Sequence, residues 1–375
     1  MKILFISELF WPYVGGAERL GARLVADLDG QGHRVLVVTS HDQLRLPDHE
    51  GFRGVPVFRF GFREALKRGD VGAVLGLRRR FRDVVGDFAP ELIHLYQPGP
   101  SALCQWDVLG SRSVPLLVTL HNDLNPGQMR EKNSVYFRLF HAATWLASCS
   151  RSALGQALAL DPSLTSRSSV IHNGVDVPDV MAAPYPEYVM QLLCLGRLVA
   201  QKGFDLALRA FAEVSPRFPD ARLVIAGDGE ERDRLEAMAN DLGLNRVTDF
   251  PGLVAPERVA ALMNQSRMVL MPSRREGLPV AALETACAAR PIIASRVGGL
   301  PELVVHNETG LLFEKEDVGE LARSVVRLLT QPALAARLGL AARKRVESHF
   351  SWRKYVDEYL ALYRRLHRTA PCPSS

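Results

Sequence analysis

The sequence lacks any apolar run near the roughly 18 residues needed to cross a bilayer. Its first ten residues, MKILFISELF, contain only four unbroken apolar residues, Ile3 to Ile6, before Ser7 and Glu8. That run is too short for the core of a signal peptide and is typical of a first buried strand.

Cysteine is also scarce and scattered. None of the five cysteines belongs to a CxxC pair or lies near a histidine cluster; they are Cys104, Cys149, Cys194, Cys287 and Cys372. We therefore expect neither a structural zinc site nor a disulfide framework, and we predict a protein of the reducing cytoplasm.

Charge is modest overall but unevenly placed. The net charge is +5, yet residues 45–82 hold ten Lys or Arg against four Asp or Glu, a local excess of +6. We do not expect nucleic acid as a partner of this basic stretch.

A chain of 375 residues is too long for one ordinary core, which indicates two domains. Short apolar strands alternate with helices throughout, a pattern that predicts parallel sheets covered on both faces. We expect strands at 2–6, 34–39, 55–60, 91–95, 115–120, 144–149, 168–172, 190–195, 222–226, 247–250, 268–271, 291–294 and 311–313. In the second half we expect helices near 203–214, 230–242, 256–264, 280–288 and 317–329.

The proline-rich segment 177–188 is the best candidate for a linker. We predict one Rossmann-like domain over 1–180 and a second over 189–350, with an amphipathic helix over 351–368 that Ser351 caps and that crosses back to the first domain. Ligands of such sheets bind beyond the carboxyl ends of the strands, so the loops that follow strands are the places to search.

In the first domain two such positions stand out. Gly15 and Gly16 directly precede a helix, where backbone amides can approach an anion, although a turn that merely needs glycine explains them equally well. His121 follows a strand and could bond a hydroxyl or a phosphate oxygen, but an ordinary buried histidine is the simpler interpretation.

In the second domain, LGRLVAQKG places Arg197 and Lys202 between a strand and a helix. A planar guanidinium and a mobile ammonium beside helix N-terminal amides suit a diphosphate. Lys202 is followed by Gly203, which rules out a Walker A loop.

The segment EGLPVAALE places Glu276 in a loop and Glu284 inside the following helix. A carboxylate in apolar surroundings needs a hydrogen-bonding partner. Two carboxylates that flank an anion-binding helix end are suited to hydroxyls, so together they suggest a nucleotide sugar. A retaining glycosidase pair is the alternative, but the helix N-terminus favours ionised Glu284 and disfavours it as the acid. The sequence DLD at 27–29 lies at a helix end, and we interpret it as solvated surface rather than a metal site.

Taken together, these segments resemble the family 4 glycosyltransferases of the GT-B fold. The resemblance rests on PYVGGAE, VTLHND, IHNGVD, LGRLVAQKG, IAGDGEER, EGLPVAALE, VGGLPELV, ETGLLF and the terminal FSW helix, in the family's order. It implies an α/β protein with two Rossmann-like, doubly wound parallel-sheet domains that face a central cleft. It further implies a nucleotide-sugar donor, transfer with retention and no cofactor or metal in the active site.

The resemblance also implies roles for individual residues. Glu276 would bind the donor sugar's hydroxyls, Glu284 the ribose, and Arg197 and Lys202 the diphosphate. Further donor contacts would come from the amides of Gly277, Leu278 and Val280, from the base-side loop of Gly252, Leu253 and Val254, and from Gly15 and Gly16. His121 would meet the sugar near the acceptor, and the catalytic set would be His121, Arg197, Lys202 and Glu276.

One departure from the family's pattern is Ala289, where glycine is usual, and we expect the turn there to differ slightly from the glycine form. We predict transfer of a hexose, from UDP rather than GDP, to a hydroxyl on a glycan or lipid-linked acceptor. A nucleotide-sugar-binding protein without turnover is the alternative, while a nicotinamide-dependent oxidoreductase is disfavoured because GxGxxG is missing.

The stretch 63–82 carries apolar residues at helical spacing among arginines. Two interpretations remain open for it. It is either a helix that rests peripherally on anionic lipid, or an ordinary helix whose apolar face packs on the first sheet while its arginines are solvated.

Overall fold

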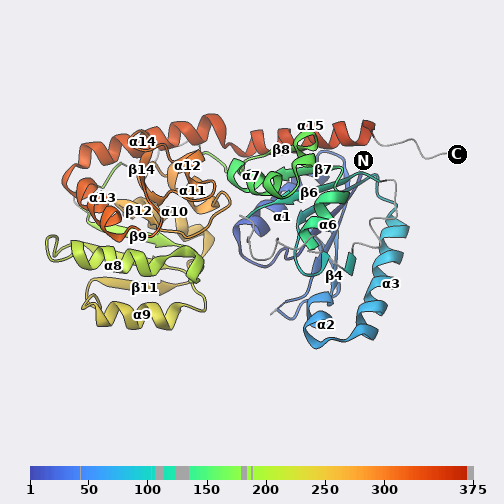
Figure 1. The fold of residues 1–375 in the computed structure, drawn as a ribbon, viewed down its shortest axis with the longest axis horizontal. Coiled ribbons are helices and arrows are strands. Elements are labelled where there is room, and N and C mark those ends of the chain that lie inside the picture. The colour runs from blue at the N-terminus through green and yellow to red at the C-terminus, as the bar shows by residue number, and fades with distance from the viewer. Residues whose placement is uncertain are drawn as a thin grey trace. The chain divides into compact units, whose positions relative to one another are not determined.

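The computed structural model describes residues 1–42, 44–102, 104–105, 114–122, 135–178, 184–186 and 189–369. The chain divides into two compact units (Figure 1). Unit 1 comprises Met1–His172 and Tyr355–Ser375, and unit 2 comprises Asn173–Lys354. The second boundary falls inside helix α15 (Trp352–Thr369), and Ser351 accepts a hydrogen bond from the amide of Lys354 as the expected cap.

Unit 1 is built on an eight-stranded sheet of order β3-β4-β2-β1-β5-β6-β7-β8. Its strands are β1 (Lys2–Ser7), β2 (Arg34–Ser40), β3 (His49–Phe52), β4 (Val55–Phe60), β5 (Leu92–Gln97), β6 (Leu116–Leu120), β7 (Trp145–Ser148) and β8 (Ser168–Val170). Every pair is parallel except β3 with β4. The helices are α1 (Gly16–Gly30), α2 (Phe62–Arg68), α3 (Val71–Phe88), α6 (Val135–Ala142), α7 (Arg151–Leu160) and the greater part of α15, with the short η1 (Pro162–Arg167).

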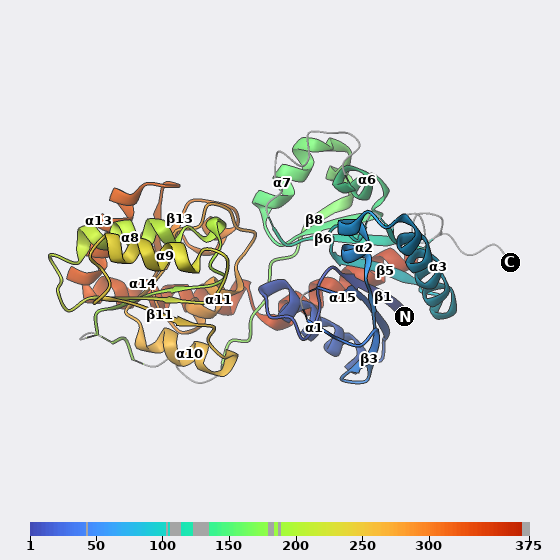
Figure 2. The same ribbon diagram turned by 90° about the horizontal axis from the view of Figure 1, so that it is seen from below.

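Unit 2, at the left in Figure 2, is built on a six-stranded parallel sheet of order β11-β10-β9-β12-β13-β14. Its strands are β9 (Gln191–Leu195), β10 (Arg222–Ala226), β11 (Thr248–Gly252), β12 (Met268–Met271), β13 (Ile292–Ser295) and β14 (Gly310–Phe313). The helices are α8 (Phe204–Val214), α9 (Arg232–Asp241), α10 (Pro256–Gln265), α11 (Val280–Cys287), α12 (Leu300–Leu303), α13 (Val318–Thr330) and α14 (Pro332–His349), with the short η2 (Ala200–Lys202).

Both sheets reverse their strand order once. In unit 2 the chain runs outward from β9 through β10 to β11 and then returns to place β12 on the other side of β9. In unit 1 it runs outward from β1 through β2 to the antiparallel pair β3 and β4, and then returns to place β5 on the other side of β1. In doubly wound sheets, ligands bind at this switch point. The places to examine are therefore the loops after β9 and β12, and those after β1 and β5.

The predicted strands are all present, with small changes at their ends. The prediction of two parallel-sheet α/β domains is confirmed. Strand β3 was missed because HEGF is short and polar, as an edge strand can be. Helix α14 was missed because its apolar residues are largely alanine and form no clear stripe.

We expected the turn at Ala289 to differ from the glycine form, and this expectation is wrong. Ala289 has φ = 53°, in the left-handed region. The amide of Arg290 donates to the carbonyl of Thr285 across it at 3.2 Å, which is the bond of a Schellman turn. Helix α14 packs closely on this turn, since a Cβ on Gly339 would lie 2.1 Å from the carbonyl oxygen of Ala289. Ala289 therefore adopts the left-handed conformation that glycine usually supplies at the end of a helix.

Candidate active site

At the switch point of unit 2, glycines allow loops to pack backbone against backbone. Gly203 has φ = 65°, and a Cβ there would lie 2.0 Å from the carbonyl oxygen of Pro272. A Cβ on Gly227 would lie 1.8 Å from the carbonyl oxygen of Gly196. Only glycine fits at these two positions, so the loops after β9, β10 and β12 form one closely packed layer.

Hydrogen bonds fix the loop after β12 against the loop after β9. The amide of Arg274 donates to the carbonyl of Gln201 at 2.8 Å, and Nε2 of Gln201 donates to the carbonyl of Arg275 at 2.9 Å. The guanidinium of Arg274 binds both carboxylate oxygens of Asp205 at 2.8 Å. Burial raises the pKa of Asp205, but the bonds and charge of Arg274 outweigh it, so the pKa is lowered and the pair stays ionised. Arg274 thus fixes the loop after β12 to the loop after β9 and to the start of α8.

Glu276 lies at the centre of this layer, with only 5% of its surface exposed. Its Oε1 accepts hydrogen bonds from Nζ of Lys202 at 2.6 Å and from Oγ of Ser273 at 2.7 Å. Lys202 and Glu276, predicted separately, are therefore brought together. Ser273 was missed, and its signal was a hydroxyl two residues past a buried strand on the same short loop.

The segment that follows Glu276 leads into an uncapped helix. Helix α11 begins at Val280, and its N-cap, Pro279, provides no side-chain bond to the first-turn amides. Nδ2 of Asn173 donates a hydrogen bond to the carbonyl oxygen of Leu278 at 2.7 Å. The amide of Gly299 donates one to the carbonyl oxygen of Gly277 at 2.6 Å. A helix start without a side-chain cap can bind an anion through its amides.

The other predicted residues of unit 2 lie around this layer. Arg197 is exposed just after β9, and Glu284 is half-buried in the second turn of α11. Gly252 ends β11 with φ = 76°. The next residue, Leu253, is 78% exposed, which is unusual for leucine, and Val254 is half-buried.

The predicted residues of unit 1 follow its own strands. His121 is buried after β6, with its ring centroid 4.2 Å from that of Tyr96. Gly15 is the N-cap of α1, and Gly16 is its exposed first residue. The carboxylate of Glu18 lies over Gly15, because a Cβ there would be 2.0 Å from its Oε2. A phosphate could approach Gly15 only if Glu18 moved away. Asp123, which completes the HND motif, lies outside the described residues.

Comparison with known sequences decides the family. The profile "Glycosyltransferase Family 4" matches residues 14–178, and the profile "Glycosyl transferases group 1" matches residues 186–345. The chain belongs to the family 4 glycosyltransferases. It is thus a glycosyltransferase of the GT-B type, as its motifs indicated.

One relative matches nearly the whole chain, and another matches less than half of it. A glycogen synthase of Mycobacterium tuberculosis is 29% identical over 97% of this chain and 94% of its own length. A GDP-mannose-dependent α-(1-6)-phosphatidylinositol monomannoside mannosyltransferase of Mycolicibacterium smegmatis is 34% identical over 43% of this chain and 44% of its own.

Solved structures agree on the fold. The sucrose-phosphate synthase of Thermosynechococcus elongatus superposes with a TM-score of 0.83 at 22% identity, covering 98% of this chain and 99% of its own. Anabaena HepE in complex with UDP superposes with a TM-score of 0.76 at 20% identity, covering 97% of this chain and 100% of its own. Among the described residues, none of the helices has the length and apolar character that a bilayer crossing requires.

Proposed function

We propose that this glycosyltransferase moves a hexose from a UDP-sugar to a hydroxyl of a glycan or lipid-linked acceptor, with retention at the anomeric carbon. The observation that carries the proposal is the contact of Lys202 and Ser273 with the buried Glu276 at the switch point of unit 2. A cation and a carboxylate are held there side by side, as a diphosphate next to a sugar requires.

When the donor binds, Lys202 and Glu276 would each exchange their mutual contact for a contact with the donor. The ammonium of Lys202 is mobile and can turn from Glu276 to a phosphate oxygen. Glu276 then has free acceptor positions for the sugar's hydroxyls, and its burial strengthens those bonds. Arg197 and the amides of Gly277, Leu278 and Val280 would bind the remaining phosphate oxygens.

Other residues would hold the ends of the donor. Glu284 would accept bonds from the ribose hydroxyls, and the exposed Leu253, between Gly252 and Val254, would cover the base. The roles that the resemblance implies for Gly16 and His121 of unit 1 stay predictions. Gly15 would take part only after Glu18 moves aside.

For the chemical step we propose displacement on one face of the sugar without an enzyme nucleophile. Arg197 and Lys202 stabilise the charge that develops on the leaving diphosphate. The acceptor oxygen bonds to the anomeric carbon as the bond to phosphate breaks, and the phosphate oxygen takes the acceptor's proton. We propose no metal for this step.

Two substitutions distinguish the roles of the glutamates. Glu276→Ala should lower transfer about 100-fold or more while leaving the Kd for UDP nearly unchanged, because Glu276 contacts the sugar. Glu284→Ala should weaken UDP itself about tenfold. Turnover with candidate donors and calorimetric titration with UDP measure the two effects.

The matched control is Glu314→Ala, which removes an exposed carboxylate of unit 2 that pairs with Arg296. It should change neither quantity. Equal effects of the Glu276 and Glu284 substitutions on UDP affinity would contradict the assigned roles.

The donor base is tested by thermal shift against UDP-sugars and GDP-sugars. GDP is the alternative because the mannosyltransferase relative is named for GDP-mannose. Stabilisation by UDP-sugars alone supports the proposal, and stabilisation by GDP-sugars alone contradicts the choice of UDP.

We also propose that the surface where α2 meets α3, here called the α2–α3 corner (Lys67, Arg68, Val71 and Leu75), contacts the anionic membrane. Val71 and Leu75 are one turn apart on α3 and are 70% and 48% exposed, with exposed Lys67 and Arg68 beside them. The rest of the apolar face of α3 packs into the core of unit 1 through Phe81 and Val85. Apolar side chains among cations at a corner suit the headgroup region of anionic lipid.

Vesicle sedimentation tests this contact. The chain should bind phosphatidylglycerol-containing vesicles and not pure phosphatidylcholine, and Val71→Ser with Leu75→Ser should weaken binding. The control is Val14→Ser, which removes an exposed valine of unit 1 far from this corner in sequence. Equal binding by the double variant would contradict the proposal.

A further inference from the structure

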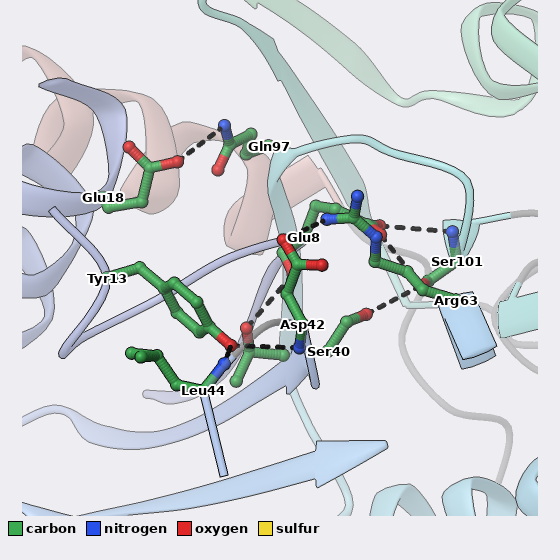
Figure 3. Close-up of polar contacts among 10 residues, drawn as sticks. Glu8, Tyr13, Glu18, Ser40, Asp42, Leu44, Arg63, Gln97 and Ser101 are labelled. Atoms are coloured by element: carbon green, nitrogen blue, oxygen red, sulfur yellow. Dashed lines mark hydrogen bonds and ion pairs between the residues drawn. The ribbon is translucent and has the colours of Figure 1, made fainter. Parts of the chain in front are cut away.

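Unit 1 has a polar cluster at its own switch point. Glu8 directly follows β1, Ser101 follows β5, and these two strands are neighbours where the strand order reverses. Ser40 ends β2 on the other side of β1, and Arg63 lies in the first turn of α2 (Figure 3). In unit 2 the corresponding place holds Lys202 and Glu276. None of the motifs that indicated the donor site includes Glu8.

Backbone and side-chain donors hold the carboxyl group of Glu8 in place. The amide of Ser101 donates to Oε2 at 3.2 Å, and Oγ of Ser101 donates to Oε1 at 3.1 Å. The hydroxyls of Ser40 and Ser101 are 2.7 Å apart. A Cβ on Gly99 would lie 2.4 Å from Cγ of Glu8, so this loop leaves room for the glutamate only because residue 99 is glycine.

The charges of the cluster disfavour an anionic ligand. Nε of Arg63 lies 3.6 Å from Oε1 of Glu8, and Nη1 donates to Asp42 at 3.3 Å, so two carboxyl groups share one guanidinium. Burial raises the pKa of Glu8 more than Ser101 and Arg63 lower it. Whether or not Glu8 is ionised, Glu8, Asp42 and Arg63 together carry no net positive charge that would attract a phosphate.

The cluster instead suits hydroxyl groups. A carboxylate can accept about four hydrogen bonds, and Ser101 supplies two of those to Glu8. The side chains of Asp42 and Arg63 are 21% and 23% exposed, so the cluster is open to solvent on their side. Tyr13 steadies that side, because its hydroxyl accepts hydrogen bonds from the amides of Asp42 and Leu44 at 3.0 and 3.3 Å (Figure 3).

We propose that Glu8, with Ser101, Arg63 and Asp42, binds the hydroxyls of an uncharged sugar or polyol portion of the acceptor. The inference deepens the proposed function and rests on it, since it assigns the acceptor's chemical class and its residues. Glu8 accepts hydrogen bonds from the acceptor, and Asp42 accepts others at the open side. Ser101 positions Glu8.

Ligand-detected NMR titration of the full chain tests the site. The neutral probes are methyl α-D-glucopyranoside and methyl α-D-mannopyranoside, and the anionic probe is glucose 6-phosphate. The wild-type chain should bind at least one neutral probe and bind glucose 6-phosphate no better. Glu8→Gln should weaken the neutral probe about tenfold, because an NH2 donor replaces one of the two oxygens that accept hydrogen bonds.

Two further variants make the test specific. Ser101→Ala should also weaken the neutral probe, by a smaller factor, and offers a second route should Glu8→Gln fail to fold. Glu64→Gln removes an exposed carboxylate next to Arg63 in sequence, whose ion-pair partner is Arg68, and should leave binding unchanged. Thermal unfolding of each variant establishes that it is folded.

Three outcomes would overturn the proposal: no binding of either neutral probe, tighter binding of glucose 6-phosphate, or unchanged binding in folded Glu8→Gln and Ser101→Ala. Calorimetric titration of the wild-type chain with UDP tests the proposed function by itself. Failure to bind UDP contradicts that function, whereas UDP binding without polyol binding contradicts only this inference.

Discussion

At the scale of the residue, Ala289 carries a conformational cost that glycine would remove. A residue with a Cβ is disfavoured in the left-handed region by about 1–2 kcal/mol. Ala289 is held there with φ = 53° by the turn that ends α11 and by the close approach of Gly339. Its methyl group is buried, which offsets part of the cost, because a buried methylene is worth about 0.8 kcal/mol.

Ala289→Gly should therefore raise the free energy of unfolding of unit 2, by up to about 1 kcal/mol. The neighbouring Ala288, with φ = −73°, is the matched control. Ala288→Gly should lower the stability by about 0.5–1 kcal/mol, since there glycine only adds freedom to the unfolded chain. Thermal or urea unfolding measures both, and a lower stability for Ala289→Gly would contradict the argument.

Glu8 links stability to pH. Its pKa is raised in the folded protein, mainly by burial, so the folded state favours the protonated form. Such a group contributes stability that is fully present below its unfolded pKa of about 4.3 and is lost as pH rises through its folded pKa. The amide of Glu8→Gln does not titrate. The stability of wild type relative to Glu8→Gln should thus fall between pH 4 and neutral pH.

Thermal unfolding of both proteins across this range measures the difference. Ser101, Arg63 and Asp42 act on the carboxyl group of Glu8, and Asp42 helps to raise its pKa. Tyr136 also faces Glu8, which helps to raise the pKa of that tyrosine. A constant difference, or one that grows with pH, would contradict the raised pKa.

The sequence predicted single residues of the candidate site, but not the contacts between them. Lys202 and Glu276 were each predicted from a local pattern, yet their bond joins positions 74 residues apart, and no local pattern encodes such a contact. Glu8 was missed because the family's motifs begin later in its loop. The same signal that marked Glu276, a carboxylate beyond a buried strand, was present there.

At the scale of the element, helix α15 is anchored to unit 1 by buried hydrogen bonds. Nδ1 of His94 lies 2.6 Å from the hydroxyl of Tyr363, and Nε2 lies 2.8 Å from Oγ1 of Thr119. The hydroxyls of Tyr96 and Tyr355 are 2.7 Å apart. Burial lowers the pKa of His94 well below its usual value, and the neighbouring His121 lowers it further. His94 is therefore neutral within this network.

Tyr363→Phe should destabilise unit 1 by about 1–3 kcal/mol, because it removes the partner of a buried histidine nitrogen. The lowered pKa of His94 contributes stability at pH values above its unfolded pKa of about 6.5. Wild-type unit 1 should therefore also lose stability as the pH falls below about 6.5. Thermal unfolding at neutral and mildly acidic pH measures both effects.

The control for this prediction is Arg364→Ala, which changes an exposed residue next to Tyr363. It should alter the stability by no more than about 0.5 kcal/mol. A Tyr363→Phe protein as stable as wild type would show that this bond does not hold the helix.

Elements buried on both sides were the ones that the sequence predicted best. Strand β12 is a continuous buried apolar run, and β10 is one after Arg222. The observed bounds of both equal the predicted ones. Strand β3 pairs only with β4, at an edge, where no apolar run is required. Its existence depends on a partner strand, which a local pattern cannot specify.

At the scale of the whole molecule, unit 1 is completed by the end of the chain. Seven side chains of α15 are buried in it: Tyr355, Val356, Tyr359, Leu360, Leu362, Tyr363 and Leu366. At roughly 1.5–3 kcal/mol each, their burial contributes about 10 kcal/mol or more. That is comparable to the entire stability of a typical domain, about 5–15 kcal/mol. Unit 2 is continuous in sequence and has its own core.

A chain that ends at Lys354 should therefore contain a folded unit 2 and an unfolded unit 1. Hydrogen exchange measures this directly: amides of β1 and β5 should lose protection, while those of β9 and β12 keep it. A chain that ends at Thr369 is the control, because it retains all of α15, and it should exchange like wild type. Protection of β1 and β5 in the shorter chain would mean that unit 1 folds without its last helix. Burial of the seven α15 side chains would then contribute far less to the stability of unit 1 than their buried area implies.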